Sequence, residues 1–126
     1  MGLTIVGCGY LGEAVARQLQ PRRTVLPLTL TTTVTERHAA LSDLADQLLL
    51  CDATDPSQLL VALQRNQTAV FSLAPRGNQQ VNADDYRQTF VDSFRCLRSL
   101  LPDLPHLRQI IYTGSCSVYG DADGDW

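Results

Sequence analysis

The sequence predicts an α/β fold built on a parallel sheet, and two observations carry this prediction. The first is a glycine-rich turn, G-C-G-Y-L-G at residues 7–12, which follows a short apolar run at 3–6 and precedes an amphipathic segment at 13–19. The second is the alternation of strand and helix signals along the rest of the chain. Alternating elements of this kind place helices on both faces of a parallel sheet.

Each further element is predicted from its own residues. Thr35 can cap a second helix, whose Ala40 and Leu41 would face inward. Asp55 and Pro56 mark the clearest helix start, because the carboxylate accepts a bond from a first-turn N–H and proline fits the first helical position. The later strands are expected over 24–30, 48–51, 68–73 and 107–112, and the later helices over 36–46, from 56 onward and over 84–101.

Five strands joined by four helices imply a sheet order. Right-handed crossovers, with the glycine turn after the first strand, give the order 3-2-1-4-5 of a doubly wound, Rossmann-type sheet. A ligand crevice then lies at the carboxyl ends of the first and fourth strands. Pro27 suits the end of the second strand better than its middle, because proline cannot donate to a strand ladder.

The glycine turn predicts a nucleotide-binding site, although glycines also serve ordinary turns. A strand, then G-x-G-x-x-G, then a helix is the context that the dinucleotide fingerprint requires. Gly7 permits the tight turn, Gly9 removes a side chain where backbone approaches a pyrophosphate, and Gly12 lets the helix pack on the strand. The helix N-terminus offers N–H groups and a partial positive charge to phosphates. Tyr10 and Leu11 therefore join the three glycines as candidate cofactor-binding residues.

Length and composition narrow the class of protein. The 126 residues form one domain, 1–126, which is short for a complete enzyme of this fold. A net charge of −3 without a basic stripe argues against nucleic acid as a partner. The chain has neither a membrane-length apolar run nor room for a signal peptide, so a cytoplasmic location is expected. Its four irregularly spaced cysteines indicate reduced core thiols rather than disulfides or a metal site.

Three motifs point to a known family: I-V-G-C-G-Y-L-G at 5–12, D-A-T-D at 52–55 and Y-T-G-S-C-S-V-Y-G at 112–120. With these motifs the chain resembles the extended or atypical short-chain dehydrogenase/reductase superfamily, in particular NAD-dependent epimerase/dehydratase-like proteins. The last motif is the most specific, and the resemblance covers essentially the whole chain. The turn departs from the usual extended pattern, G-x-x-G-x-x-G, in a way that is common in the atypical subgroup.

The resemblance implies roles for particular residues. Ser115 occupies the place of the catalytic serine that hydrogen-bonds the reacting oxygen. Asp52, followed by Ala53, matches the aspartate that contacts the adenine amino group. The segment that passes along the cofactor after the fourth strand corresponds to Leu73, Ala74 and Pro75. Each residue also has an ordinary alternative: Ser115 can satisfy strand-end backbone groups, and Asp52 can cap a turn.

Two parts of the family's site are not found in this sequence. The helix asparagine of the family falls near Phe90, where Asp92 is a neighbouring polar candidate. The catalytic Tyr-x-x-x-Lys pair belongs further along than Trp126. The expectation is therefore a cofactor-binding portion, truncated before the substrate lobe and inactive alone, because a serine without that pair cannot exchange the proton at a useful rate.

The lack of an acidic residue at the end of the second strand favours NADP over NAD as the cofactor. An acidic side chain there binds the ribose 2′-hydroxyl of NAD. The sequence has no Asp or Glu from residue 14 to 35, and it offers Thr31 and Thr32, with Arg37 a turn later. Threonine hydroxyls and an arginine can bind a 2′-phosphate. An arginine at the position of Arg37 is more often a solvated helix residue than a phosphate clamp.

Three functions remain open from the sequence. The first is an oxidoreductase or epimerase acting on a sugar nucleotide or another hydroxy/keto substrate. The second is a non-catalytic NAD(P)-binding sensor or regulatory protein on the same fold. The third, a ligand-gated module of the kind attached to potassium channels, is disfavoured because it presents an acid after the second strand. In every case Ile110 and Ile111 lie on an open sheet edge, which predicts self-association.

Overall fold

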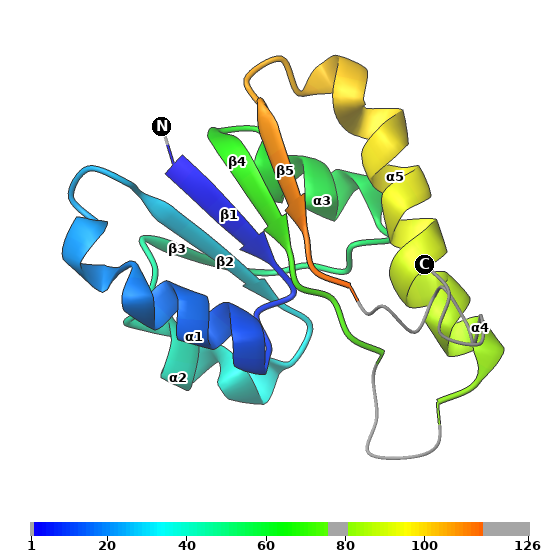
Figure 1. Cartoon of the computed structure of the whole chain (residues 1–126), viewed down its shortest axis with the longest axis horizontal. Helices are drawn as coiled ribbons and strands as arrows, with labels where there is room; N and C mark the ends of the chain where they lie inside the picture. The colour runs from blue at the N-terminus through cyan, green and yellow to red at the C-terminus, as the bar shows by residue number, and fades with distance from the viewer. Residues whose placement is uncertain (1, 76–80, 115–126) are drawn as a thin grey trace, which may run out of the picture.

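The chain folds around a five-stranded sheet in which every neighbouring pair of strands is parallel. The structure is a computed structural model that describes residues 2–75 and 81–114. The strand order is β3-β2-β1-β4-β5, which confirms the predicted order (Figure 1). The strands are β1 (Gly2–Val6), β2 (Leu28–Thr32), β3 (Gln47–Leu50), β4 (Asn66–Phe71) and β5 (Gln109–Tyr112).

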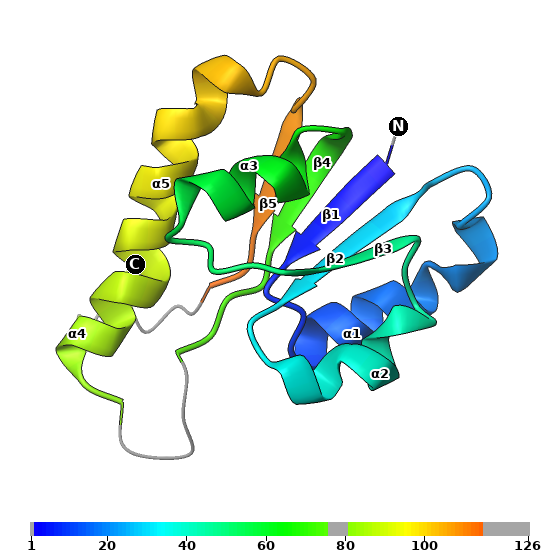
Figure 2. The same ribbon diagram turned by 180° about the vertical axis from the view of Figure 1, so that it is seen from behind.

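Helices cover both faces of the sheet, as the alternating signals predicted. Figures 1 and 2 show α1 (Tyr10–Gln18) and α2 (His38–Ser42) on one face, and α3 (Pro56–Leu63) and α5 (Ser93–Leu100) on the other. The short α4 (Ala83–Tyr86) leads into α5. Within the described ranges, no helix has the length and apolarity that a bilayer crossing requires.

The core consists of two apolar layers, one on each side of the sheet. Ile5 of β1 packs with Leu30 and Val70 toward α1 and α2. Its neighbour Val6 packs with Phe71 toward α3 and α5. Successive residues of a strand point to opposite faces, so a strand that is covered on both sides carries mostly apolar side chains. The polar exception in β1, Thr4, is buried with its hydroxyl hydrogen-bonded to Ala62 O.

The second strand lies further along the chain than predicted. It begins at Leu28 rather than at residue 24, because Pro27 has no N–H for the ladder. The carbonyl of Pro27 instead accepts a bond from Leu3 N at 2.9 Å, just before the strand starts. The shift brings Thr31 and Thr32 into the strand, where both are buried.

The second helix is shorter than predicted. A 3-10 turn precedes α2, the Thr35 side chain makes no capping bond, and Ala40 is exposed rather than inward. The segment leaves helical geometry because Asp46 is engaged by β2. Its backbone N–H donates to Leu28 O at 2.9 Å, and its carboxylate accepts from Leu28 N at 2.7 Å. These bonds start the extended segment that becomes β3.

The third helix begins where the sequence predicted. The Asp55 carboxylate accepts from Ser57 N at 3.0 Å and from Gln58 N at 3.2 Å, and Pro56 is the first helical residue. A capped start of this kind satisfies amide groups that have no partner inside the helix. It also sets where the segment joining β3 to α3 ends, and that segment reaches the functional site.

The long helix predicted over 84–101 is divided by a π-helical turn at Arg87–Asp92. Thr89 Oγ1 donates to Asp85 O at 2.8 Å, and Ser93 Oγ donates to Thr89 O. Hydroxyls that bond the preceding turn compete with the helical ladder, and π-helical turns occur often at functional sites. The turn alters the direction of side chains between α4 and α5.

A buried polar network joins three strands at their amino-terminal ends. Asn66 Nδ2 donates to Thr4 Oγ1 at 2.6 Å and to Thr29 Oγ1 at 3.1 Å. Thr4 Oγ1 donates in turn to Ala62 O at 2.8 Å. Because each buried polar group has a partner, the network fixes the register of β1, β2 and β4 without leaving an unpaired group.

Candidate nucleotide-binding site

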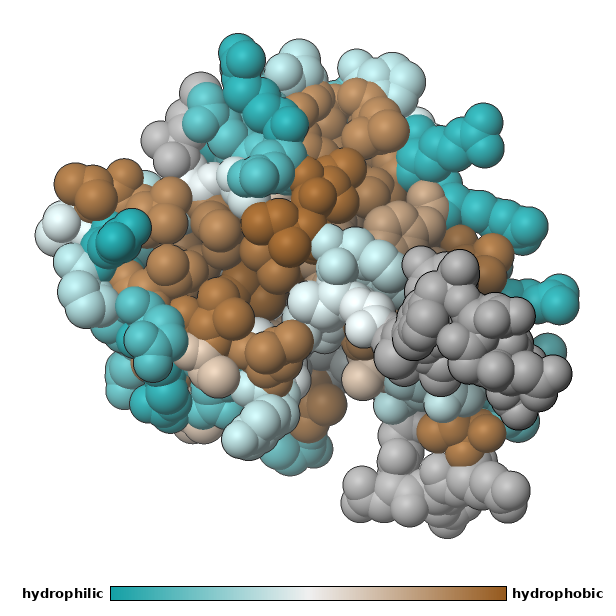
Figure 3. Space-filling view, in the orientation of Figure 1, coloured by the Kyte–Doolittle hydropathy of each residue, from teal (hydrophilic) through white to brown (hydrophobic). Residues whose placement is uncertain are grey.

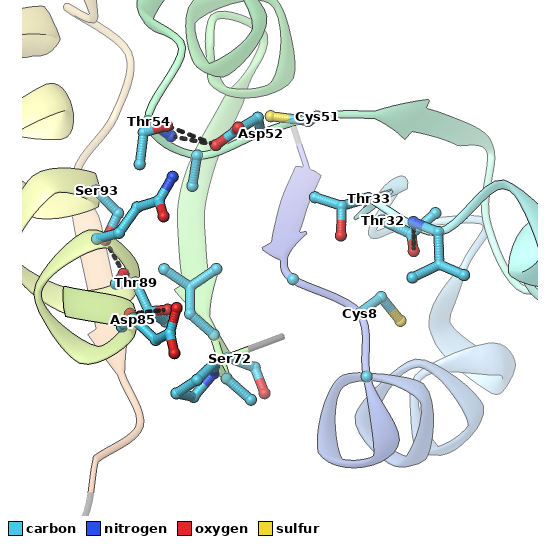
Figure 4. A pocket seen from close by; sticks show the side chains of 18 of the residues that line it. Cys8, Thr32, Thr33, Cys51, Asp52, Thr54, Ser72, Asp85, Thr89 and Ser93 are labelled. Carbon is cyan, nitrogen blue, oxygen red and sulfur yellow. Dashed lines mark hydrogen bonds between the residues drawn. The ribbon is translucent and has the colours of Figure 1, made fainter. Parts of the chain in front are cut away.

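A cavity of about 420 Å³ lies at the carboxyl ends of the strands (Figure 4). Its walls come from the glycine turn, the end of β2, the segments after β3 and β4, and the helical segment 83–100. This segment, called the α4–α5 helix below, runs from α4 through the π-helical turn into α5. Figure 4 shows these segments facing one another around an open space. The predicted site residues among its lining are Gly7, Gly9, Thr32, Arg37, Asp52, Ala53, Leu73, Ala74 and Pro75.

Gly7 and Gly9 shape the floor of this cavity. Gly7 has a φ of +80°, and a Cβ there would lie 2.7 Å from Leu73 Cδ2 and 2.9 Å from Ser72 O. Apart from Gly9 itself and its two chain neighbours, no described residue has a heavy atom within 4 Å of the position that a Cβ on Gly9 would take. Since Gly9 lines the cavity, its missing side chain leaves space for a ligand to approach the backbone.

The N-terminus of α1 faces this space without a side-chain cap. Among the described residues, the backbone N–H groups of Tyr10, Leu11 and Gly12 donate no hydrogen bond. The Tyr10 and Leu11 side chains are exposed and do not line the cavity, so only their amides can serve a ligand in it. Gly12 is buried, and a Cβ there would lie 3.1 Å from Ile5 Cγ2. Free amides at a helix start fit a diphosphate.

The threonines at the end of β2 divide into two groups. Thr31 is buried and holds the glycine turn, because its Oγ1 accepts from Gly7 N at 3.0 Å. It does not line the cavity. Thr32 and Thr33 do line it, and Thr32 Oγ1 accepts from Val34 N at 3.1 Å. The sequence grouped Thr31 with Thr32 as cofactor-binding candidates, and the structure gives them different surroundings.

Arg37 spans the gap between the end of β2 and the glycine turn. Its Nη1 donates to Cys8 O at 3.0 Å and its Nη2 donates to Glu13 Oε2 at 2.7 Å. Glu13 also accepts from Arg17 Nη2 at 2.9 Å. The hydrogen bond from Arg17, with the positive charges of Arg17 and Arg37, holds the pKa of Glu13 below its ordinary value.

Asp52 and the helix opposite it form the other walls. The Asp52 carboxylate accepts from Thr54 N at 2.9 Å and Thr54 Oγ1 at 2.7 Å, which positions it at the cavity. Sequence reasoning missed the helix wall, which consists of Asp85, Gln88, Thr89 and Ser93. Polar residues inside an otherwise apolar helical stripe were the available signal. Asp92, the candidate for the family's helix asparagine, does not line the cavity.

The described cysteines are buried thiols, as expected. Cys8, Cys51 and Cys96 are free and buried. Burial raises the pKa of Cys8 to about 11 and that of Cys51 to about 12. No cluster of His, Cys, Asp and Glu in residues 2–75 and 81–114 has the arrangement of a metal site. Ser115, the predicted catalytic serine, lies outside the described residues.

The fold and the cavity together define a nucleotide-binding α/β domain, and comparison with known proteins gives the family. The profile of the NAD dependent epimerase/dehydratase family matches residues 3–125, so the chain belongs to that family. D-erythronate dehydrogenase of Cupriavidus necator is 30% identical over 125 residues, covering 90% of this chain and 38% of that protein. This confirms the resemblance predicted from the three sequence motifs.

Solved structures share the fold. The structure of gox2253 is 25% identical, with a TM-score of 0.76, over 98% of this chain and 37% of its own. A uronate dehydrogenase variant from Agrobacterium tumefaciens, solved in complex with NAD, has a TM-score of 0.69 at 16% identity, over 90% of this chain and 40% of its own. The chain therefore spans between 37% and 40% of the length of these relatives. The family description makes a nicotinamide dinucleotide the class of ligand that membership implies.

Proposed function

We propose that this chain is the cofactor-binding portion of an NAD(P)-dependent oxidoreductase or epimerase. The observation that carries the proposal is the open space at Gly9 beside the uncapped amides of α1. A diphosphate is the group that such a cradle suits, because it brings two negative charges to unpaired N–H donors. Both features lie in a cavity large enough to take part of a dinucleotide.

The other walls supply groups for the remainder of the cofactor. Asp52 is proposed to accept a bond from the adenine amino group, with Ala53 beside it. The segment Leu73, Ala74 and Pro75 would line the path from the diphosphate toward the nicotinamide. When bound, the cofactor supplies hydride transfer. The protein's own part would be to orient a substrate oxygen through Ser115, while the Tyr-x-x-x-Lys pair that moves the proton of that oxygen is not found in this sequence.

The substrate class is proposed to be a sugar nucleotide or another hydroxy/keto compound. The relative of Cupriavidus necator is named for oxidation of D-erythronate, which is a hydroxylated acid. A substrate of that kind carries the hydroxyl group that a cofactor-dependent dehydrogenase oxidises.

NADP is proposed as the preferred cofactor. Thr32 and Thr33, at the end of β2, line the cavity where an NAD-binding protein of this fold presents an acid. Among the described residues that line the cavity, Arg37 is the cationic one. Hydroxyls and a guanidinium favour a 2′-phosphate, whereas an acid would repel it.

Fluorescence titration of the purified chain tests both parts of the proposal. NADPH and NADH are each expected to bind, with NADPH the tighter of the two. Failure of both nucleotides to bind would overturn the proposed function. Equal affinities, or a preference for NADH, would overturn the NADP assignment and leave dinucleotide binding intact.

A further inference from the structure

Arg37 is held by two partners that both belong to the diphosphate-binding turn and its helix. One terminal nitrogen bonds Cys8 O at 3.0 Å, and the other bonds a Glu13 oxygen at 2.7 Å. These contacts join residues far apart in sequence. The residue proposed to recognise a 2′-phosphate is therefore already engaged within the protein.

The contact with Glu13 is an ion pair in a partly sheltered position. The Arg37 side chain is 30% exposed and the Glu13 side chain is 24% exposed. A pair that is mostly removed from water is less screened than a surface pair, so its charges influence a nearby ligand more strongly. Glu13 accepts from Arg17 as well, and it is the acidic residue of the first turn of α1.

The position of Glu13 gives it two effects on a bound dinucleotide. Its carboxylate neutralises part of the Arg37 charge, and it keeps the guanidinium directed toward the glycine turn. A 2′-phosphate must compete with the carboxylate for the same terminal nitrogen. A ribose 2′-hydroxyl carries no charge, so NADH binding does not require that competition.

We propose that Glu13 is a specificity-determining residue, which lowers the preference of this site for a 2′-phosphorylated cofactor by pairing with Arg37. The inference rests on the proposed function and adds to it a residue that does not line the cavity. The site then accepts NADPH with an advantage over NADH that is smaller than threonines and an unpaired arginine would give.

The test is a titration of the Glu13→Gln variant with NADPH and NADH. Glutamine keeps the size of the side chain and removes its charge. The ratio of the NADH dissociation constant to the NADPH dissociation constant is expected to rise about fivefold, the upper end of the effect of one solvent-accessible ion pair. Adenosine 2′-monophosphate should bind more tightly to the variant as well, which isolates the effect from the nicotinamide.

Two further variants distinguish the mechanism from a general change in charge. Asp103→Asn removes one negative charge from an exposed residue that does not line the cavity. The ratio of its NADH and NADPH dissociation constants should equal that of the parent chain. Adding Arg37→Leu to Glu13→Gln should abolish the gain, because the charge that Glu13 restrains is then absent. Thermal unfolding of each variant verifies that it folds.

The outcomes separate this inference from the proposed function. If the parent chain binds neither nucleotide, the proposed function fails. If the parent chain binds both but Glu13→Gln leaves the ratio unchanged or lowers it, the inference fails and cofactor binding stands. A rise that persists without Arg37 would also overturn the inference, because the effect would then come from the helix terminus.

Discussion

Gly7 and Gly9 lie close together in one turn but serve it in different ways. Gly7 adopts a left-handed φ and lies against Leu73 and Ser72, so it is required for the turn to form beside β4. Gly9 has a negative φ and open space beside it. A side chain at Gly7 disturbs the protein, whereas a side chain at Gly9 occupies room that a ligand needs.

Alanine substitution at the two glycines should therefore affect different properties: protein stability at Gly7 and ligand affinity at Gly9. Gly7→Ala is expected to lower the free energy of unfolding by about 2 kcal/mol, because a left-handed φ strains residues with a side chain. Gly9→Ala should leave urea unfolding unchanged but weaken NADPH binding about tenfold, the low end of the effect of losing one hydrogen bond to a charged group. Unchanged NADPH affinity in Gly9→Ala would remove the main support for the diphosphate site.

The buried thiols make a second prediction at the residue scale. At pH 8, Cys8 and Cys51 should react slowly with iodoacetamide in the folded chain and quickly in urea, because burial disfavours the thiolate. Peptide mass spectrometry assigns the reaction to each cysteine. Rapid labelling of Cys8 without urea would contradict the enclosed position that the structure gives it.

The same thiols predict how stability depends on pH. The pKa of Cys8 rises from 9.0 in the unfolded reference to about 11 in the folded chain. Between these values the unfolded state loses a proton that the folded state keeps. The stabilisation is therefore complete below pH 9 and is lost as the pH rises toward 11. Urea unfolding at pH 8 and pH 10.5 should show this decrease, which Cys8→Ala should reduce.

At the scale of secondary-structure elements, the residues at which α3 and α4 begin position the walls of the cavity. Asp55 caps α3 and thereby ends the segment that carries Asp52 to the site. The capping box of Asn82 and Asp85 starts α4, and the π-helical turn follows at once. The polar lining of the helix wall thus depends on where α4 begins and on the hydroxyl bonds of Thr89 and Ser93.

Removal of the Asp55 cap tests this dependence. Asp55→Ala is expected to lower the free energy of unfolding by about 1 kcal/mol, because two first-turn amides lose their acceptor. Ser57→Ala serves as the control, since that side chain is exposed and, among the described residues, only the backbone amide of Ser57 makes a hydrogen bond. If both variants unfold at the same urea concentration, the cap contributes nothing.

At the scale of the whole molecule, β5 is the last strand of the sheet in the part of the chain that the structure describes, and it is apolar and exposed. All four residues of β5 are exposed, and Ile110 and Ile111 remain 40% and 42% accessible. Ile111 is in register with Val70, which packs toward α1 and α2. Figure 3 shows apolar surface gathered across the sheet on the face seen in Figure 1. Unpaired backbone and apolar side chains together favour pairing with another chain.

Self-association is the resulting prediction. Light scattering of the purified chain should give a mass above that of a monomer, increasing with protein concentration. Ile111→Lys should shift the distribution toward monomer, because a charge would be buried in the contact. Gln109→Lys adds the same charge to an exposed polar position of the same strand, and should have less effect. A stable monomer at high concentration would rule out association through this edge.

Local patterns in the sequence were sufficient for the architecture. The apolar run before G-C-G-Y-L-G, the capping pair Asp55 and Pro56, and the alternation of elements predicted the sheet order correctly. They succeed because each depends on neighbouring residues or on a general rule of chain handedness. The bounds of the second strand and second helix were wrong, because bonds from Leu3 and Asp46, both distant in sequence, decide where β2 starts.

The sequence by itself predicted the kind of site, because a glycine turn between a strand and a helix is the context that the dinucleotide fingerprint requires. The tertiary structure decided the contacts made there. It placed Thr31 behind the turn rather than in the cavity, it brought the α4–α5 helix opposite Asp52, and it paired Arg37 with Glu13. These contacts join residues distant along the chain, and only the packing of strands and helices determines which of them meet.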